Sequence, residues 1–355
     1  MKMIISKSIL ENILVHAGPF LEKKDTSQIT SHVYLNVSDS KLTVKATDYE
    51  IGYQVVTDKI NAINDGSATA NGKKFLDIVR ILKDGDIHLE VKNEMLYISQ
   101  SHSNFKLPTF SYNEFPQFPS YEGKTGITID SFLLIDSLKK ITPAIDNNNP
   151  KFELNGALID IKEDVINFAS TDTRRLAVVT IQNKSSNQLS IILPRKAIVE
   201  IQKLFFENME LYYDETNLII HSSQYTFFTK LINGKFPEYS RIIPKQIANT
   251  LILPKALMIE SIKQITTISS DVKITFLNNL ITFESLSDDN IEAKTEIEFN
   301  TGFLTPFTIA INSRYLLDFL NTINSSQFSI GLNEGNLPFT LSDENFKTVV
   351  MPIVI

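Results

Sequence analysis

Three parts of this chain resemble one another at a nearly constant spacing, and this internal repetition limits the possible folds more than any other feature. Amphipathic helical patterns begin at Ser6, Gly72, Asp130, Pro194, Pro254 and Ser313. Aligned positions in the first, third and fifth patterns are offset by 123 and 124 residues, and those in the other three by 122 and 118. Six patterns in two matched series indicate tandem copies of one unit.

Alternating runs rich in β-branched residues lie between the helical patterns and follow them, which is typical of strands. We therefore predict an α+β fold of three tandem domains, each with two helices packed on β-sheets and roughly eight strands. Pro, Gly and polar residues cluster near the expected boundaries, which divide the chain into residues 1–122, 123–244 and 245–355. The alternative is three unrelated α+β domains of similar size.

The motifs that carry most known catalytic and metal-binding chemistries are missing from the sequence. Cysteine is absent, which excludes disulfides, Cys-ligated zinc, iron–sulfur clusters and thiol catalysis. The Gly123-Lys124-Thr125 segment lacks the leading glycine of a phosphate loop, because Phe118 stands there. The five histidines are scattered and form no metal motif. We therefore predict no catalytic residues, no metal and no cofactor.

Acidic clusters leave one enzymatic alternative open. They comprise Ser287–Asp289 and Glu292–Glu298, and on an alternating strand such residues are typical of a solvated face. The alternative is a hydrolase or transferase with an unrecognised carboxylate site on a duplicated α+β fold. A third possibility is a structural ring or solenoid that binds no nucleic acid.

The chain has no apolar run near the roughly 18 residues that a membrane helix needs. Its first residues, MKMIISKSIL, lack the apolar core and small-residue cleavage site of a signal peptide. We therefore expect a cytoplasmic protein that does not bind membranes.

The charge is unevenly divided between the helical patterns and the remainder of the chain. The formal net charge is -7, but the six helical windows carry +7 and the other residues -14. Lys and Arg are good helix formers, so propensity alone could explain this division. The alternative is a helix-lined basic surface that contacts phosphates without reading sequence, within an acidic outer shell that repels them.

Several segments resemble, in family order, motifs of the bacterial DNA polymerase III β subunit family, the sliding clamps. Thr171–Val178 is similar to the family's TDxxRLA segment, and Ala46–Glu50 to its TDLE. The other matches are Leu154–Leu158 (LNG), Leu193–Ala197 (VPRK), Gly234–Tyr239 (GRFPDY) and Val349–Ile355 (VMPM/I). One departure is Thr173-Arg174, which replaces the frequent Gly-His pair and puts a β-branched side chain where glycine is common.

The resemblance implies a head-to-tail homodimeric ring of six similar subdomains, with helices lining the hole. Such a ring encircles double-stranded DNA without sequence preference and tethers the polymerase, so it acts as a processivity factor and not as an enzyme. The candidate phosphate contacts are Lys23, Lys24, Lys73, Lys74, Arg80, Lys139, Lys140, Arg195, Lys196 and Lys203. Phe152 is a candidate for an aromatic contact with DNA.

The resemblance also implies a pocket between the second and third domains, where the polymerase and clamp-loader subunits insert short hydrophobic peptides. The pocket residues carried over by motif are Leu154, Thr171, Thr173, Arg174, Arg175, Leu176, Pro237, Ile242, Val349, Met351, Pro352 and Ile353. Apolar walls would bury a partner's Leu or Phe, while Thr171 and Arg175 would hold its backbone. The alternative for Leu154 and Val349 is core packing at a domain seam.

The same resemblance predicts the dimer seam. Phe105 and Leu107 of the first domain would pack against Ile268 and its neighbours in the third domain of the other chain, which would extend a sheet across the interface. Lys73 and Lys74 could face Glu292, Glu296 and Glu298. Because His102, Ser103 and Asn104 occupy positions that are basic in other clamps, we expect few interfacial ion pairs and a weak salt dependence of dimer stability.

Overall fold

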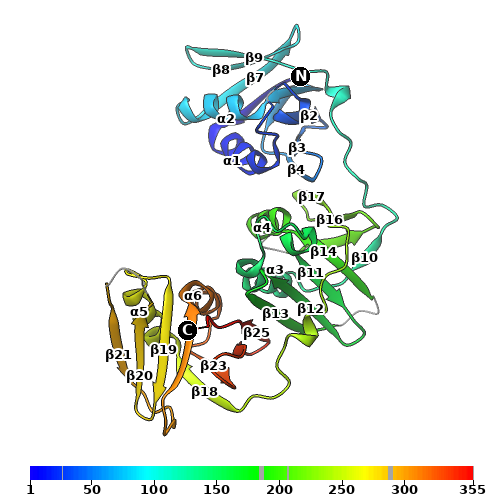
Figure 1. Cartoon of the computed structure of the whole chain (residues 1–355). Helices are drawn as coiled ribbons and strands as arrows, with labels where there is room; N and C mark the ends of the chain where they lie inside the picture. The colour runs from blue at the N-terminus through cyan, green and yellow to red at the C-terminus, as the bar shows by residue number, and fades with distance from the viewer. Residues whose placement is uncertain (26, 184–187, 206–207, 287–290, 355) are drawn as a thin grey trace. The chain divides into compact units, whose positions relative to one another are not determined.

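A computed structural model describes residues 1–25, 27–183, 188–205, 208–286 and 291–354 (Figure 1). These residues form an α+β fold with two α-helices in each predicted repeat. The helices are α1 (Lys7–Ala17), α2 (Gly72–Ile81), α3 (Ser131–Ile141), α4 (Arg195–Leu204), α5 (Lys255–Ile265) and α6 (Ser313–Thr322). The described strands number nine, eight and eight in the three predicted repeats, close to the eight expected.

The first helices of the three repeats are in register at a uniform spacing of 124 residues. Leu10, Leu134 and Met258 occupy the same helical position, and all three side chains are buried. The sequence alignment was therefore wrong by one residue between the first repeat and the other two, because it matched Ile9 with the exposed Phe132 and with Ala256. The apolar face of each helix packs on its sheets, so burial and not residue similarity sets the register.

Contact density divides the chain into two compact units. Unit 1 contains residues 1–132 and 199–231, and unit 2 contains residues 133–198 and 232–355. The central repeat thus contributes strands to both units, and the units follow shared sheets, not repeats. The predicted boundaries at 122/123 and 244/245 stay predictions.

Unit 1 contains two antiparallel sheets. The five-stranded sheet has the order β5-β1-β7-β8-β9, and its strands are β1 (Lys2–Ser6), β5 (Asn61–Asn64), β7 (Asp86–Lys92), β8 (Met95–Gln100) and β9 (Ser103–Pro108). The eight-stranded sheet has the order β10-β15-β16-β17-β4-β3-β2-β6. Its strands are β2 (His32–Ser38), β3 (Lys41–Thr47), β4 (Ile51–Thr57), β6 (Gly66–Asn71), β10 (Thr125–Ile127), β15 (Glu210–Tyr213), β16 (Asn217–His221) and β17 (Tyr225–Lys230).

The eight-stranded sheet of unit 1 joins two repeats through the pair β17–β4. Thr229 lies opposite Ile51, and Gly52 lies opposite Phe228. A Cβ on Gly52 would come within 2.0 Å of the Phe228 ring, so only glycine permits this ring to lie across the seam. Phe118 lies in the segment that connects the first two repeats. Its ring packs edge-on against Phe228 and holds this segment against the shared sheet.

Unit 2 repeats this arrangement. Its eight-stranded sheet has the order β14-β11-β12-β13-β25-β24-β23-β18, and its four-stranded sheet has the order β21-β20-β19-β22. The first comprises β11 (Gly156–Ile161), β12 (Val165–Thr171), β13 (Arg175–Gln182), β14 (Leu189–Pro194), β18 (Asn249–Pro254), β23 (Gln327–Leu332), β24 (Phe339–Asp343) and β25 (Phe346–Val350). The second comprises β19 (Asp271–Leu277), β20 (Leu280–Ser285), β21 (Lys294–Glu298) and β22 (Phe307–Asn312). Helix α5 packs on β20 and β21 (Figure 1).

A buried histidine ties the end of the first repeat to its sheet. His32 is 3% exposed, its ring stacks on Phe110, and its Nδ1 lies 3.3 Å from the Thr69 hydroxyl oxygen. Burial, with a smaller contribution from the charge of Lys74, lowers the pKa of His32 to about 4. The imidazole is therefore neutral at physiological pH.

We expect this histidine to make the stability of unit 1 fall in mild acid. The unfolded chain takes up a proton near pH 6.5, whereas the folded chain does so near pH 4, so stability is lost as the pH falls through this interval. Between pH 7 and pH 5 the loss is about 2 kcal/mol. Hydrogen exchange of β2 and β6, corrected for intrinsic rates, measures it. The His32→Gln variant should lose this pH dependence, and the exposed-site control His102→Gln should keep it.

Candidate functional site

The seam between β13 and β25 lies over a cluster of buried apolar side chains, called here the apolar cluster. It comprises Leu154, Leu158, Ala169, Leu176, Val178, Ile192, Phe236 and Val349, with Ile232, Tyr239 and Ile243 packed against it. Leu176 lies opposite Val349 across the strand pair. The sheet therefore brings together three predicted pocket residues that are far apart in sequence, namely Leu154, Leu176 and Val349.

The turn that leads into β13 is organised by Asp172. Its Oδ1 accepts hydrogen bonds from the backbone N–H groups of Arg174 and Arg175, both at 3.0 Å. The Thr171 hydroxyl accepts from the Thr173 N–H at 3.1 Å and donates to the Arg175 carbonyl at 2.6 Å. These bonds hold Thr173 at a φ of 73°, a left-handed conformation that is unfavourable for a β-branched residue.

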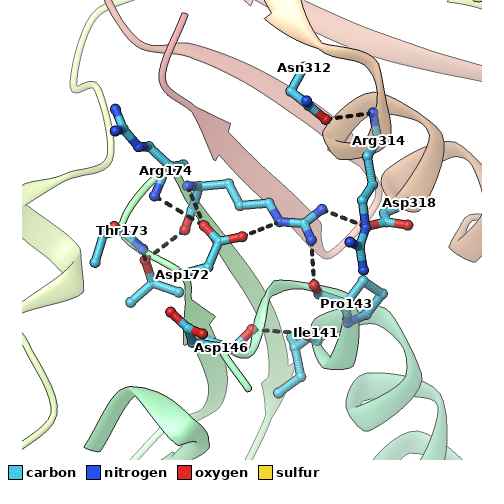
Figure 2. A network of polar contacts seen from close by, with 12 residues as sticks. Ile141, Pro143, Asp146, Asp172, Thr173, Arg174, Asn312, Arg314 and Asp318 are labelled. Atoms are coloured by element: carbon cyan, nitrogen blue, oxygen red, sulfur yellow. Dashed lines mark hydrogen bonds and ion pairs between the residues drawn. The ribbon is translucent and has the colours of Figure 1, made fainter. Parts of the chain in front are cut away.

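The Arg175 guanidinium lies within a network of three elements, and Figure 2 shows its partners Asp172, Asp318 and Pro143. Its Nε–H donates to Asp172 Oδ2 at 3.0 Å, Nη1 to Asp318 Oδ2 of α6 at 2.8 Å, and Nη2 to the Pro143 carbonyl after α3. The Tyr315 ring centroid lies 4.6 Å from the guanidinium carbon. Arg175 is 5% exposed, so its charge is enclosed by these partners.

These contacts correct the roles predicted for Thr171 and Arg175. Both were expected to hold a partner's backbone. The hydroxyl of Thr171 is engaged within its own turn, and the guanidinium of Arg175 points to Asp172, Asp318 and Pro143. Both side chains are buried, so they support the seam from within.

The C-terminal segment borders the apolar cluster. The Met351 N–H donates to the Arg174 carbonyl at 2.9 Å, and the Ile353 N–H to the Ala310 carbonyl at 2.8 Å. The Met351 side chain is 41% exposed, and that of Ile242 is 42% exposed. The chain thus fixes the backbone of this segment while it leaves apolar side chains open to solvent, a combination typical of a binding surface.

The predicted pocket residues fall into two groups. The buried group comprises Leu154, Thr171, Arg175, Leu176 and Val349. For Leu154 and Val349, burial agrees with the alternative of core packing. The exposed or partly exposed group comprises Thr173, Arg174, Pro237, Ile242, Met351, Pro352 and Ile353. Sequence reasoning missed Asp318 and Tyr315, whose only sequence signal is their place on a predicted helix. It also missed Phe236, although the quoted GKFPEY segment contains it.

The connecting segment between the last two repeats is anchored next to the apolar cluster. The Tyr239 hydroxyl donates to Asp160 Oδ2 at 3.1 Å. Burial and the neighbouring carboxylate raise the pKa of Tyr239, so the phenol stays protonated and keeps donating. This bond holds the segment that carries Pro237 and Ile242 against the sheet.

The candidate DNA-binding residues are distributed over both units. In unit 1, Lys23 and Lys73 line one cavity of about 440 Å³ between the end of α1 and the start of α2. Lys24, Lys74, Arg80 and Lys203 are also exposed there. In unit 2, Lys139, Lys196 and Phe152 are exposed and Arg195 is partly exposed. The structure therefore leaves most of these side chains accessible to a phosphate backbone.

One of these assignments needs correction. Lys140 is 7% exposed and its Nζ pairs with Asp136 at 2.9 Å, so it cannot reach a phosphate. Lys23 and Lys24 remain candidates but lie beyond α1, which ends at Ala17 because Gly18 and Pro19 follow it. With the observed bounds, the six helices carry a formal charge of +6, close to the predicted excess.

The predicted dimer residues are not equally accessible. Phe105 of β9 is partly exposed, and Ile268, just after α5, is exposed. Leu107 is 6% exposed and lies opposite Leu96, in the core of its own chain. The expectation that Leu107 packs against another chain was therefore wrong, since little of its surface remains to be covered.

Relief of the strained turn should stabilise the protein. We expect Thr173→Gly to raise the free energy of unfolding by about 1 kcal/mol, because glycine adopts a positive φ without steric cost. The backbone bond from residue 173 to the Thr171 hydroxyl would remain. Urea unfolding followed by circular dichroism measures the change. The control Thr250→Gly, on exposed β18 with no positive φ, should destabilise; a loss in both variants would contradict the strain argument.

Two further features of the described residues bear on other functions. Within them, no group of three or more His, Cys, Asp or Glu side chains is placed to hold a metal ion. None of the described helices has the length and apolar character to cross a membrane. The acidic Ser287–Asp289 cluster noted in the sequence lies outside the described residues.

Comparison with known proteins gives one consistent result along the chain. Models of the N-terminal, central and C-terminal domains of the DNA polymerase III beta subunit match residues 1–119, 128–238 and 240–354. The chain is 38% identical to the beta sliding clamp of Helicobacter pylori over the full length of both, and 26% identical to that of Vibrio cholerae over 99% of this chain and 100% of that protein. The crystal structure of the H. pylori beta clamp bound to a DNA ligase peptide has a TM-score of 0.95 at 39% identity, with complete coverage of both chains.

Proposed function

The chain belongs to the DNA polymerase III beta subunit family, and from this premise we propose that it is a DNA replication processivity factor. Two chains form a ring around duplex DNA, and the ring holds replication proteins through short apolar peptides. The observation that supports the ring is that β9 and β21 are edge strands, each without a pairing partner on one side among the described residues. The proposed role needs no catalysis, so we infer a non-catalytic accessory subunit and set the hydrolase or transferase alternative aside.

The internal repeat supports this closure. The third strand after the first helix of each repeat is β4, β13 or β21, and the third strand after the second helix is β9, β17 or β25. Within the chain, β17 pairs with β4 and β25 pairs with β13, both antiparallel. In both pairs, the third strand after the second helix of one repeat joins the third strand after the first helix of the preceding repeat. The same pattern would pair β9 of one chain with β21 of a second copy. Two such head-to-tail pairings close a two-chain ring and leave neither β9 nor β21 open.

Cysteine cross-linking tests the ring directly, because the natural chain contains no cysteine. We expect Asn104→Cys on β9, combined with Lys294→Cys or Glu296→Cys on β21, to produce a disulfide-linked dimer under mild oxidation. The two partner positions are two residues apart and therefore share one face of the strand. Non-reducing electrophoresis measures the yield, and one of the two pairs should link most of the protein.

A matched control uses another sheet edge of the same chain. Asn104→Cys combined with Asn249→Cys, on the exposed edge strand β18, should stay largely monomeric on the gel. Equal cross-linking in the control, or none with either β21 partner, would rule out the β9–β21 pairing.

Phosphate contacts within the ring would come from the exposed basic residues. The positive helices and the pair Lys23 and Lys73, which line one cavity, support a surface that contacts the DNA backbone. Such contacts are individually weak and exchangeable and carry no sequence information, so they allow a ring to slide. We keep Lys23, Lys24, Lys73, Lys74, Arg80, Lys139, Phe152, Arg195, Lys196 and Lys203 as candidates and remove Lys140.

Partner peptides would dock beside the apolar cluster, where Met351 and Ile242 remain exposed. The H. pylori clamp, which shares this fold over its whole length, binds a DNA ligase peptide. We propose that this chain binds peptides of the same kind, from the polymerase, the clamp loader and other replication or repair proteins. An apolar anchor would cover Met351 and Ile242, and Pro237 and Arg174 would line the rim. With chromosomal DNA as its partner, the ring would act in the cytoplasm.

A further inference from the structure

The network around Arg175 connects the candidate peptide site to helix α6. Asp318 Oδ2 lies 2.8 Å from Arg175 Nη1 and 3.6 Å from Arg314 Nε. Asp172 supplies the second carboxylate, at 3.0 Å from Arg175 Nε. Two aspartates thus balance two arginines, of which Arg175 is buried and Arg314 is exposed. Asp318 is the only one of these carboxylates that α6 contributes (Figure 2).

Side-chain alternation along β13 places this network directly behind the site. The Arg175 side chain points toward α6, while its neighbour Leu176 belongs to the apolar cluster. The carbonyl of Arg174 receives the N–H of Met351, and Arg175 lies opposite Val350. A displacement of the Arg175 side chain would therefore move the backbone that supports both Leu176 and Met351.

We propose that Asp318 is a positioning residue for partner binding. Acting through the Arg175 guanidinium, it holds the 174–176 backbone in the position at which Met351, supported by the buried Leu176 and Val349, receives a partner's apolar side chain. This proposal rests on the proposed peptide-binding function. Asp318 itself touches no partner, since its carboxylate faces the two arginines.

The physical reason is that a buried guanidinium needs hydrogen-bond acceptors in fixed directions. Arg175 presents N–H donors in a fixed plane to Asp172, Asp318 and the Pro143 carbonyl, with the Tyr315 ring against its face. Loss of the Asp318 charge leaves a buried cation with one ionised partner instead of two. The side chain then moves toward Asp172 or solvent, and the strand that carries it moves as well.

The test measures binding of a fluorescein-labelled H. pylori DNA ligase peptide to the full-length protein by fluorescence polarisation. We expect Asp318→Asn, which keeps the size of the side chain, to weaken binding about tenfold, and Asp318→Glu to restore part of the affinity. In an Arg175→Gln background, Asp318→Asn should have no further effect, because Asp318 acts only through that guanidinium.

Asp136→Asn is the matched control, since it removes the carboxylate partner of another buried cation in unit 2, Lys140, away from the apolar cluster. It should lower thermal stability to a similar extent and leave peptide affinity unchanged. Equal affinity of Asp318→Asn and the natural protein, additive effects with Arg175→Gln, or an equal affinity loss in Asp136→Asn would each overturn the proposal. Failure of the natural protein to bind the peptide would instead refute the proposed function.

Discussion

Loaded onto a nicked circular plasmid by its clamp loader, this protein is expected to remain bound through gel filtration in 0.5 M salt and to be lost once the plasmid is linearised. A closed ring is held by topology, so screening of its phosphate contacts does not release it from a circle. On linear DNA the same weak contacts let it slide off the ends. The difference should approach complete retention against complete loss.

The measurement is the amount of labelled protein that elutes with DNA before and after cutting at a single site. Blocking both ends of the linear DNA with a bulky protein should restore retention. A Lys73→Glu, Lys74→Glu double variant should reduce loading but leave peptide binding intact, because both exposed lysines lie in unit 1 and the candidate peptide site lies in unit 2. Equal retention on circular and linear DNA would refute the topological mechanism.

Deletion of the last five residues, 351–355, is expected to abolish binding of a polymerase or ligase peptide, with affinity at least about 100-fold lower. The deletion removes the exposed Met351 side chain. It also removes two backbone donors, Met351 N–H to Arg174 and Ile353 N–H to Ala310, which hold the segment in place. Met351→Ala, which keeps the backbone bonds, should cause a smaller but clear loss of affinity.

Fluorescence polarisation with the labelled peptide measures both variants, and gel filtration checks that the dimer persists. The dimer should persist because β9 and β21 lie outside the deleted segment. Leu304→Ala is the control, since Leu304 is an exposed apolar residue of unit 2 that lies outside the apolar cluster and its rim. Unchanged peptide affinity after the deletion would refute the assignment of this site.

Local sequence patterns were sufficient for the elements and for much of the site. The helical patterns predicted all six α-helices of the described residues. The period of buried residues survives even where their identities differ, as with Leu10, Leu134 and Met258. The motifs around Leu154, Leu176 and Val349 identified residues that the fold gathers into one cluster. Motif matching works here because each motif is a short segment that forms one turn or one strand by itself.

Local patterns did not reveal which side of an element each residue faces. Lys140 and Lys139 are adjacent and chemically identical, but one is buried against Asp136 and the other is exposed. Leu107 was expected at an interface and lies in its own core, since the pairing of β8 with β9 turns it inward. Burial depends on the partner strand or helix, which a single segment does not specify.

The amino-acid sequence alone was enough to establish the threefold repeat, the family and the positive helices, because each depends on residue spacing, motif order or charge. Tertiary structure was needed to learn that the repeats share eight-stranded sheets, that β9 and β21 stay open, and that Arg175 is enclosed by Asp172, Asp318 and Pro143. Strand pairing and ion pairing join residues that are far apart in the sequence; Arg175 and Asp318, for example, are 143 positions apart. Only the folded chain brings such residues into contact, and that contact determines which side chains remain available to a partner.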